Sequence, residues 1–307
     1  MQVEKIIQSP FNYTGGKFKL LPQILPFFPD NIDTFVDLFS GGGNVGINVK
    51  ANHVIFNDIE ECILKIMNLW KTDSYENISK KIQKIIRKFN LSDSSKYSYE
   101  KYNCNSNIGL SDYNKEPFKQ LKTQLNSRTV RSSQYYHELY TAIIYAFNNQ
   151  IRFNSRNEFN LPVGKRDFND VIKLKLKTFI ARLHDIDCVF SNNDFRKFNF
   201  SALSTDSFVY ADPPYLITCA SYNENGGWSQ DCETSLFEVL DKLNSNGIKF
   251  ALSNVLEAKG KENQLLKRWI EENPSYICHH LKHSYSNANY QRKETSAITD
   301  EVLITNY

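Results

Sequence analysis

The sequence lacks the features of a membrane-spanning or disulfide-rich secreted protein. Its 307 residues contain no apolar run near the ~20 residues that cross a bilayer, and the first residues do not have the basic start and apolar block of a secretory leader. The six cysteines are dispersed, without a CxxC pair or a Cys/His cluster, and the histidines have no acidic or cysteine partners in a metal-binding pattern. We therefore expect a cytoplasmic protein with reduced thiols, no metal and no membrane contact.

Basic residues are concentrated in the middle of the chain. The net charge is only +3, but residues 61–190 hold 22 Lys and Arg against 13 Asp and Glu, and both flanks are net acidic. Because contacts to phosphates need Lys and Arg, this region is where a polyanion is expected to bind. The alternative is a solvated helix face, and Lys80 and Lys84 fit it because Ile78 and Ile82 mark an amphipathic helix.

Strand and helix patterns alternate at both ends of the chain, and the middle is mainly helical. The expected strands are 34–39, 53–57, 186–190, 207–211, 249–253, 276–281 and 302–305, and the expected helices are 44–51, 60–70, 76–90, 115–126, 134–149, 169–183, 234–244 and 257–272. This order predicts an α/β fold with a mostly parallel sheet, interrupted in sequence by a helical insert. The predicted division is 1–73, 74–184 for the insert, and 185–307.

A glycine-rich turn follows the first expected strand. Gly41-Gly42-Gly43-Asn44-Val45-Gly46 fits the G-x-G-x-x-G pattern of a nucleotide-binding turn. Asp58, at the end of the next strand, is suited to accept both ribose hydroxyls of NAD or of S-adenosylmethionine. Asp37, inside the first strand, is suited to hold the ammonium of a methionine moiety. The turn therefore predicts a nucleoside-type cofactor without deciding which one.

The strand at 207–211 ends in Asp212-Pro213-Pro214-Tyr215. Each proline fixes its own φ and cannot donate to the sheet, so the segment is rigid and leaves the sheet at once. Ligands of open α/β sheets bind beyond the carboxyl ends of the strands, where this segment and the glycine turn are both expected.

The residue types of this segment suit methylation of an amino group. The adenine amino group is a weak nucleophile because its lone pair is delocalised into the ring, so a catalyst must accept its hydrogens. Asp212 and the Pro213 carbonyl are suited to accept them, and Tyr215 is suited to stack on a base flipped out of the duplex. Direct displacement needs no covalent intermediate, which agrees with the absence of cysteine from the motif.

These motifs, in this order, resemble the DNA adenine methyltransferase (Dam-like) family over nearly the whole chain. The resemblance rests on Phe11-Asn12-Tyr13-Thr14-Gly15-Gly16-Lys17, Phe39-Ser40-Gly41-Gly42-Gly43, Asn57-Asp58 and Asp212-Pro213-Pro214-Tyr215. It implies a Rossmann-like S-adenosylmethionine-dependent methyltransferase sheet with an inserted, mainly helical target-recognition domain. Tyr13 departs from the Trp of the best-known members but remains aromatic.

The resemblance also implies site residues. Asn193-Asp194-Phe195 resembles a motif whose acid contacts the cofactor adenine and whose aromatic ring packs beside it, although a simple loop acid is the alternative. Asp212 is expected between cofactor and base. The cofactor-binding candidates are Tyr13, Gly16, Lys17, Asp37, Phe39, Gly41, Gly43, Asp58, Asp194, Phe195 and Asp212.

The segment from Asn148 to Arg166 resembles the part of the family that touches DNA, and it is dense in side chains suited to phosphates and base edges. Phe153 and Phe159 are expected to pack rather than intercalate. The DNA-binding candidates are Asn149, Arg152, Asn154, Asn160, Lys165 and Arg166.

The leading hypothesis is therefore a site-specific enzyme that methylates N6 of adenine in double-stranded DNA. The insert resembles enzymes that read four-base palindromes such as GATC, and a cognate restriction endonuclease is a conceivable partner. The alternatives are an RNA or protein-glutamine methyltransferase, an NAD-dependent oxidoreductase and a non-catalytic DNA-binding regulator. Glutamine-modifying enzymes usually carry Asn where Asp212 stands, which counts against them.

Overall fold

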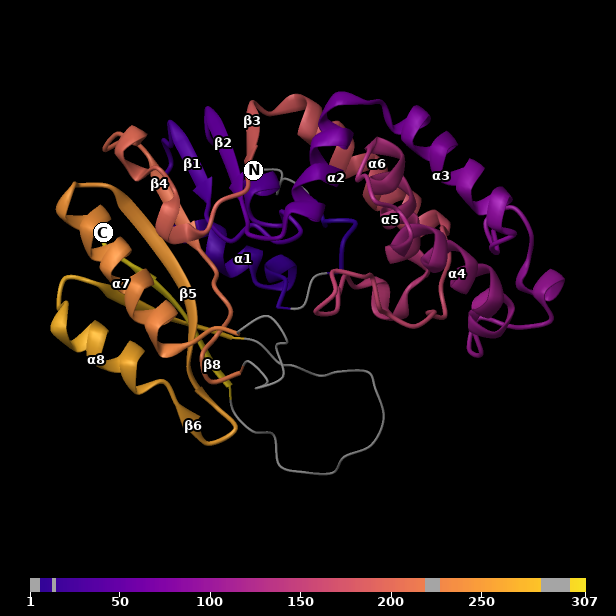
Figure 1. Cartoon of the computed structure of the whole chain (residues 1–307). Coiled ribbons are helices and arrows are strands. Elements are labelled where there is room, and N and C mark those ends of the chain that lie inside the picture. The colour runs from indigo at the N-terminus through magenta and orange to yellow at the C-terminus, as the bar shows by residue number, and fades with distance from the viewer. Residues whose placement is uncertain (1–5, 13–14, 219–226, 283–298) are drawn as a thin grey trace. The chain divides into compact units, whose positions relative to one another are not determined.

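The chain folds into two compact units, each assembled from separate segments. The computed structural model describes residues 6–12, 15–218, 227–282 and 299–307 (Figure 1). Unit 1 comprises Met1–Phe18, Gly41–Asn48 and Glu60–Phe190, and unit 2 comprises Lys19–Ser40, Val49–Ile59 and Ser191–Tyr307. The predicted division at 1–73, 74–184 and 185–307 stays a prediction.

Helices and strands of the described residues follow the predicted alternation. The α-helices are α1 (Leu21–Ile24), α2 (Glu61–Thr72), α3 (Tyr75–Phe89), α4 (Ser111–Asn126), α5 (Ser133–Tyr145), α6 (Asp170–Asp185), α7 (Gln230–Ser245) and α8 (Gln264–Glu272). The strands are β1 (Thr34–Asp37), β2 (His53–Asn57), β3 (Cys188–Ser191), β4 (Phe208–Ala211), β5 (Lys249–Ala258), β6 (Lys261–Glu262), β7 (Ile277–Leu281) and β8 (Thr299–Thr305).

The sheet has the strand order β3-β2-β1-β4-β5-β8-β7, and β6 pairs with β5. β1 runs parallel to β2 and β4, and β4 runs parallel to β5, whereas β8 is antiparallel to β5 and β7. The fold-class prediction is confirmed: this is a mixed α/β protein with a central, mostly parallel sheet, consistent with a Rossmann-like methyltransferase fold. The carboxyl ends of β1, β2 and β4 therefore meet at one edge.

The two faces of the sheet bury different side chains, because successive strand residues point to opposite sides. On one face, Val209 packs in a cluster with Leu236 of α7 and Trp269 of α8, and Figure 1 shows these helices side by side along β5. On the other face, Phe208 packs edge-on against Phe28, with ring centroids 4.8 Å apart.

The helix predicted at 44–51 is wrong. These residues, all within the described chain, form only a 3-10 turn at Gly46–Asn48. The reason is competition from side-chain amides: Asn48 donates to the carbonyl of Asn44 at 2.8 Å and also pairs with both backbone groups of Ile7. Amides that bond locally to backbone offer it an alternative to the helix.

The helix predicted at 257–272 is too long at its start. β5 continues to Ala258 and turns at Lys259 and Gly260, both of which have positive φ, before returning as β6. The helix begins only after Asn263, whose side chain accepts a hydrogen bond from the Leu266 N–H at 3.1 Å. β5 is therefore ten residues long and extends well past the end of β4.

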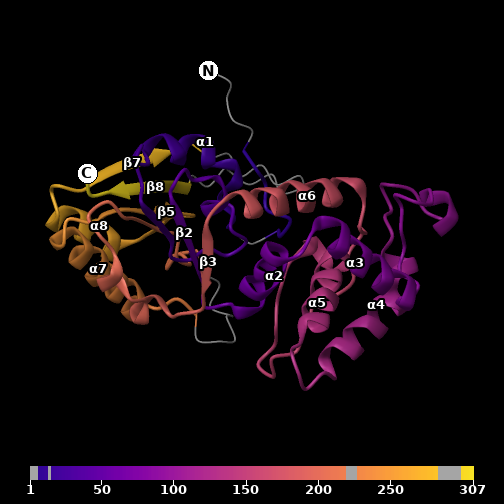
Figure 2. The same ribbon diagram turned by 90° about the horizontal axis from the view of Figure 1, so that it is seen from above.

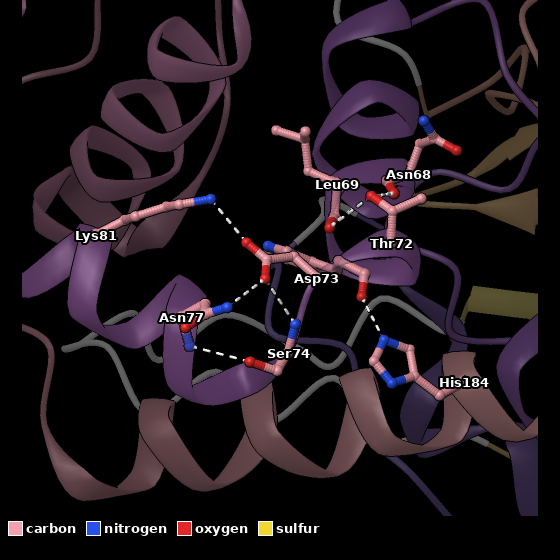
Figure 3. A network of polar contacts seen from close by, with 9 residues as sticks. Asn68, Leu69, Thr72, Asp73, Ser74, Asn77, Lys81 and His184 are labelled. Atoms are coloured by element: carbon pink, nitrogen blue, oxygen red, sulfur yellow. Dashed lines mark hydrogen bonds and ion pairs between the residues drawn. The ribbon is translucent and has the colours of Figure 1, made fainter.

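The helices of unit 1 pack on one another, as Figure 2 shows for α3, α4, α5 and α6. Asp73 lies between α2 and α3, and its carboxylate accepts hydrogen bonds from Lys81 at 2.7 Å, the Ser74 N–H at 2.9 Å and the Asn77 side chain at 3.0 Å (Figure 3). The Lys81 hydrogen bond is the main reason that the pKa of Asp73 is lowered. The N-cap of α3 is Ser74, whose side chain accepts a hydrogen bond from the Asn77 N–H at 3.2 Å, so a second helix begins here.

His137 of α5 makes the stability of the protein depend on pH. The side chain is buried, and burial together with the positive charge of Lys81 lowers its pKa from 6.5 to about 4. The unfolded chain therefore binds more protons than the folded one between these values, and stability falls as the pH drops from 6.5 towards 4. The full loss is on the order of 3 kcal/mol.

We predict that His137→Gln removes this part of the pH dependence. Urea unfolding of both proteins at about pH 7 and about pH 4.5 measures it, because the difference in their free energies of unfolding should change with pH. Parallel pH profiles for the two proteins would contradict the assignment.

Candidate active site

The segment Asp212 to Tyr215, which the sequence predicts to be catalytic, leaves the sheet where β4 ends. Asp212 is half-buried, Pro213 is buried and Pro214 is exposed. The Tyr215 hydroxyl donates to Oδ1 of Asp212 at 2.8 Å. Burial, reinforced by the negative charges of Asp212 and Glu301, raises the pKa of Tyr215 well above its ordinary value. The phenol therefore keeps its proton and donates a hydrogen bond to the carboxylate in this structure.

Polar side chains on one face of the sheet surround this segment. Asp37, the last residue of β1 and 1% exposed, lies opposite Tyr210 of β4 in the strand register. The hydroxyl of Tyr210 is 2.7 Å from Oγ of Ser253 on β5. Burial is the main cause, and Asp212 the second, of a pKa of Tyr210 well above its ordinary value. The negative charges of Asp37 and Asp212 thus both raise the pKa of the same side chain, Tyr210.

Asn57, the last residue of β2, joins the segments that follow β1 and β3, a role that sequence reasoning missed. Its buried side-chain amide donates to the carbonyls of Leu38 and Asn193, both at 3.0 Å, and its Oδ1 accepts from the Asn193 N–H at 3.2 Å. The adjacent Asp58, 8% exposed, is held at the same edge. The Asn-Asp pair at the end of a strand is the signal that was available in sequence.

Three aromatic rings gather beside these strand ends. The ring of Phe39 lies 5.4 Å from Phe195 and 5.6 Å from Trp228, and Phe195 and Trp228 are also 5.6 Å apart. The indole N–H of Trp228 donates to the buried carboxylate of Glu233 on α7. Phe39 and Phe195 were predicted, whereas Trp228 was missed because nothing near it in sequence marks a ligand site.

The carboxylate of Asp194 forms an ion pair with Arg196. Its carboxylate accepts hydrogen bonds from the Arg196 guanidinium at 2.8 and 2.5 Å and from the Arg196 N–H at 2.9 Å. This ion pair lowers the pKa of Asp194. The loop-capping alternative therefore describes its present contacts, and contact with a cofactor adenine stays a prediction.

The glycine turn lies in unit 1. Gly41 and Gly43 have φ of +47° and +74°, which suits glycine. A Cβ on Gly42 would lie 3.0 Å from Oγ of Ser9, so this glycine allows close packing on the N-terminal segment. The Ser9 N–H in turn donates to Oδ1 of Asn44 at 2.9 Å. The turn is thus built against residues that precede it by more than thirty positions.

The first predicted motif is only partly described. Tyr13 lies outside the described residues. Gly16 is exposed, whereas Lys17 is 4% exposed and its ammonium donates to the carbonyl of Gly15 at 3.0 Å.

Residues 146–163 form a hairpin-like excursion with antiparallel bridges at both ends, Ala146 to Val163 and Phe153 to Phe159. Phe159 is buried and packs edge-on against Phe153, as predicted. The backbone of Phe159 makes two hydrogen bonds to the side chain of Asn126 on α4, at 2.9 and 3.0 Å. The hairpin is therefore held to α4 by these two hydrogen bonds.

The predicted DNA-binding residues of the hairpin differ in their exposure and in the hydrogen bonds that their side chains make. Arg152 is exposed, and its Nε donates to Asn160 at 2.8 Å. Asn154 is engaged inside the turn, with hydrogen bonds to the Arg156 N–H and to Glu158. Asn149 has positive φ and donates to the carbonyl of Ile144.

Lys165 and Arg166 are exposed just beyond the hairpin. Their backbone is fixed on both sides: the Gly164 N–H donates to Tyr145 at 2.7 Å, and the carbonyl of Lys165 accepts from the Leu110 N–H at 3.0 Å. A Cβ on Gly164 would collide with the Ala146 carbonyl. The two cations therefore project from a rigid segment.

Comparison with known proteins decides the family. The model of the D12 class N6 adenine-specific DNA methyltransferases matches residues 13–289. The chain belongs to this family. It is 45% identical over 307 residues to the type II methyltransferase M.FokI of Planomicrobium okeanokoites and 39% identical over 310 residues to the modification methylase StsI of Streptococcus sanguinis.

Relatives of this D12-class chain differ in length. The matches cover 98% and 99% of the chain but only 43% of M.FokI and of StsI. A DNA adenine methylase of Haemophilus influenzae is 27% identical over 88% of the chain and 90% of its own length.

The part of the chain that the structure describes contains no group of three or more His, Cys, Asp or Glu side chains placed to hold a metal ion. Within the same residues, every helix is too short or too polar to cross a membrane.

We predict that Asn57→Ala lowers the free energy of unfolding by about 2–4 kcal/mol, because buried backbone groups of Leu38 and Asn193 lose their partner. Urea unfolding measures the change. Asn52→Ala is the matched control, because the exposed Asn52 side chain donates to Asp33 at 3.2 Å on the surface, and its loss should shift stability by less than about 0.5 kcal/mol. Equal losses in both variants would refute the linking role of Asn57.

Proposed function

We propose that this chain transfers a methyl group from S-adenosylmethionine to N6 of an adenine in double-stranded DNA. The observation that carries the proposal is the Asp212 carboxylate at the carboxyl end of β4, held by the Tyr215 hydroxyl at 2.8 Å. This carboxylate lies on the same sheet edge as the residues that follow β1 and β2. Family membership supports adenine as the methylated base.

The residues of unit 2 fit a nucleoside cofactor with a charged amino-acid tail. The aromatic rings of Phe39, Phe195 and Trp228 suit a flat base, the carboxylate of Asp58 suits the ribose hydroxyls, and that of Asp37 suits the ammonium. When bound, S-adenosylmethionine supplies an electrophilic methyl group on its sulfonium. The single 3-10 turn after Gly43 counts against NAD, whose pyrophosphate normally binds the N-terminus of an α-helix there.

Asp212 and the Pro213 carbonyl are placed to accept the two hydrogens of the adenine amino group. Both groups precede or form part of a Pro-Pro segment, so their positions vary little. Accepting these hydrogens favours a pyramidal nitrogen with an available lone pair. The target base must first leave the duplex, and we propose that the half-buried ring of Tyr215 stacks on it.

Double-stranded DNA is the partner that we propose for the exposed cations of unit 1. Arg152, Lys165 and Arg166 are exposed on the hairpin or directly after it. The segment 61–190 carries 22 basic against 13 acidic residues. This surplus favours duplex DNA over a protein glutamine as substrate.

We further propose a short recognition site, with GATC as the first sequence to test. Two relatives bear names of modification enzymes, so we also propose service in a restriction-modification system with a companion endonuclease. Sequencing adenine methylation in DNA from cells that express the chain identifies the site. Adenine that remains unmethylated throughout the genome would refute the proposed activity.

Asp212→Ala should abolish methyl transfer while cofactor binding and DNA binding persist, because the carboxylate acts on the amino group rather than on either ligand's affinity. The expected loss is at least about 100-fold in kcat. Transfer of labelled methyl groups to DNA measures the rate, and calorimetry measures cofactor affinity. Wild-type rates in this variant would remove the basis of the mechanism.

Arg152→Ala and Lys165→Ala should weaken DNA binding and flatten its salt dependence. Each phosphate contact that is lost reduces the slope of log K against log salt by about 1. Fluorescence anisotropy over a salt series measures the slope. Lys242→Ala, at the exposed end of α7, is the matched control and should leave the slope unchanged. An unchanged slope in all three variants would exclude phosphate contact by Arg152 and Lys165.

A further inference from the structure

Glu301 of β8 is a buried carboxylate beside the catalytic segment. Its side chain is 1% exposed, and it lies opposite Val255 in the part of β5 that extends past the end of β4. The residues that follow it in β8, Val302, Leu303 and Ile304, are all buried and apolar. A carboxylate in this position is expensive to bury and needs hydrogen-bond donors.

The hydroxyl of Tyr215 lies between two carboxylates. It donates to Oδ1 of Asp212 at 2.8 Å and is 3.3 Å from Oε1 of Glu301. A phenol has one proton, so a strong hydrogen bond to one carboxylate weakens the bond to the other. The distances show that Asp212 holds the larger share in this structure.

In the proposed reaction, the carboxylate of Asp212 must accept hydrogen bonds from two donors. It receives the Tyr215 hydroxyl in the structure, and it must also accept hydrogen from the adenine amino group. If Oδ1 keeps the phenol, that oxygen offers less electron density to the amine. A second acceptor within reach of the phenol removes this conflict, and Glu301 is placed to be that acceptor.

We propose that Glu301 is a positioning residue for methyl transfer, which accepts the Tyr215 hydroxyl when Asp212 engages the target amino group. The proposal rests on the proposed function, because it assigns Asp212 to an amine. Only the phenol O–H changes its direction between the two carboxylates, so no bond to carbon forms or breaks at Glu301. The residue acts through Tyr215 and does not touch the substrate.

The test compares Glu301→Leu with Glu301→Gln. Leucine removes the acceptor without leaving a buried charge, so the fold should be kept, and kcat should fall about 10- to 100-fold, the effect of one lost hydrogen bond. Glutamine retains a carbonyl oxygen and should restore kcat to within about threefold of wild type. Cofactor affinity, measured by calorimetry, should stay within about twofold in both variants.

A double-mutant cycle with Tyr215→Phe separates positioning from a general structural role. Once the phenol hydroxyl is gone, Glu301→Leu should change kcat by less than about twofold, because its effect passes through that hydroxyl. Asp300→Leu is the matched control: Asp300 is the adjacent strand residue, pairs with His280 at 2.8 Å, and should leave kcat unchanged.

Several outcomes would overturn the proposal. Unchanged kcat in Glu301→Leu, equal losses in the Leu and Gln variants, or a loss that persists fully in the Tyr215→Phe background would each exclude the positioning role. A loss of melting temperature and cofactor affinity in step with kcat would show that Glu301 is structural. A wild-type protein that transfers no methyl group to DNA would instead refute the proposed function.

Discussion

The alternation of side chains along β1, β4, β5 and β8 decides which polar groups meet beside the Pro-Pro segment. Asp37 and Tyr210 occupy one register row, and Ser253 lies two residues beyond the β5 partner of Tyr210 on the same face. Glu301 extends this face past the end of β4. The opposite face is filled by apolar residues from α7 and α8. A shift of one residue in the register of any of these strands would move its side chains to the opposite face, and the polar groups would no longer meet.

Because the polar groups of this face are buried, they fix the geometry of the site but add little to the free energy of unfolding. Buried carboxylates gain from hydrogen bonds roughly what they lose in desolvation, so the arrangement contributes geometry more than net free energy. Tyr215 bonds to Asp212, Tyr210 bonds to Ser253, and both phenols have a raised pKa chiefly because they are buried. Groups that stay protonated in this way are dependable donors at neutral pH. The Asp212 carboxylate, the proposed acceptor of the amino hydrogens, is therefore oriented by the Tyr215 hydroxyl in the structure without a ligand.

Sequence patterns predicted the elements that depend on local chemistry and failed where distant contacts decided. The glycine turn after β1 and the Pro-Pro segment were predictable because glycine tolerates the positive φ of a tight turn and proline fixes its own φ. The helix at 44–51 was wrong because Asn48 bonds to Ile7, forty-one residues away. Glu301 was missed because the last strand was expected to begin at Val302, and only pairing with the extended β5 shows that β8 begins at Thr299. Asn57 was read as part of a motif, but its links to Leu38 and Asn193 required the folded sheet.

In the hairpin of unit 1, the residues that anchor the loop are different from the residues that are exposed to solvent. Phe159 is buried and its backbone is bonded on both sides by Asn126, whereas Arg152 and Arg156 project into solvent. Asn157 turns the chain in the left-handed region, which asparagine tolerates better than most residues. Substitution of the exposed residues therefore leaves the anchor untouched. If the proposed DNA contacts lie on these exposed residues, the bases that the hairpin reads can change without a change in the fold that presents it.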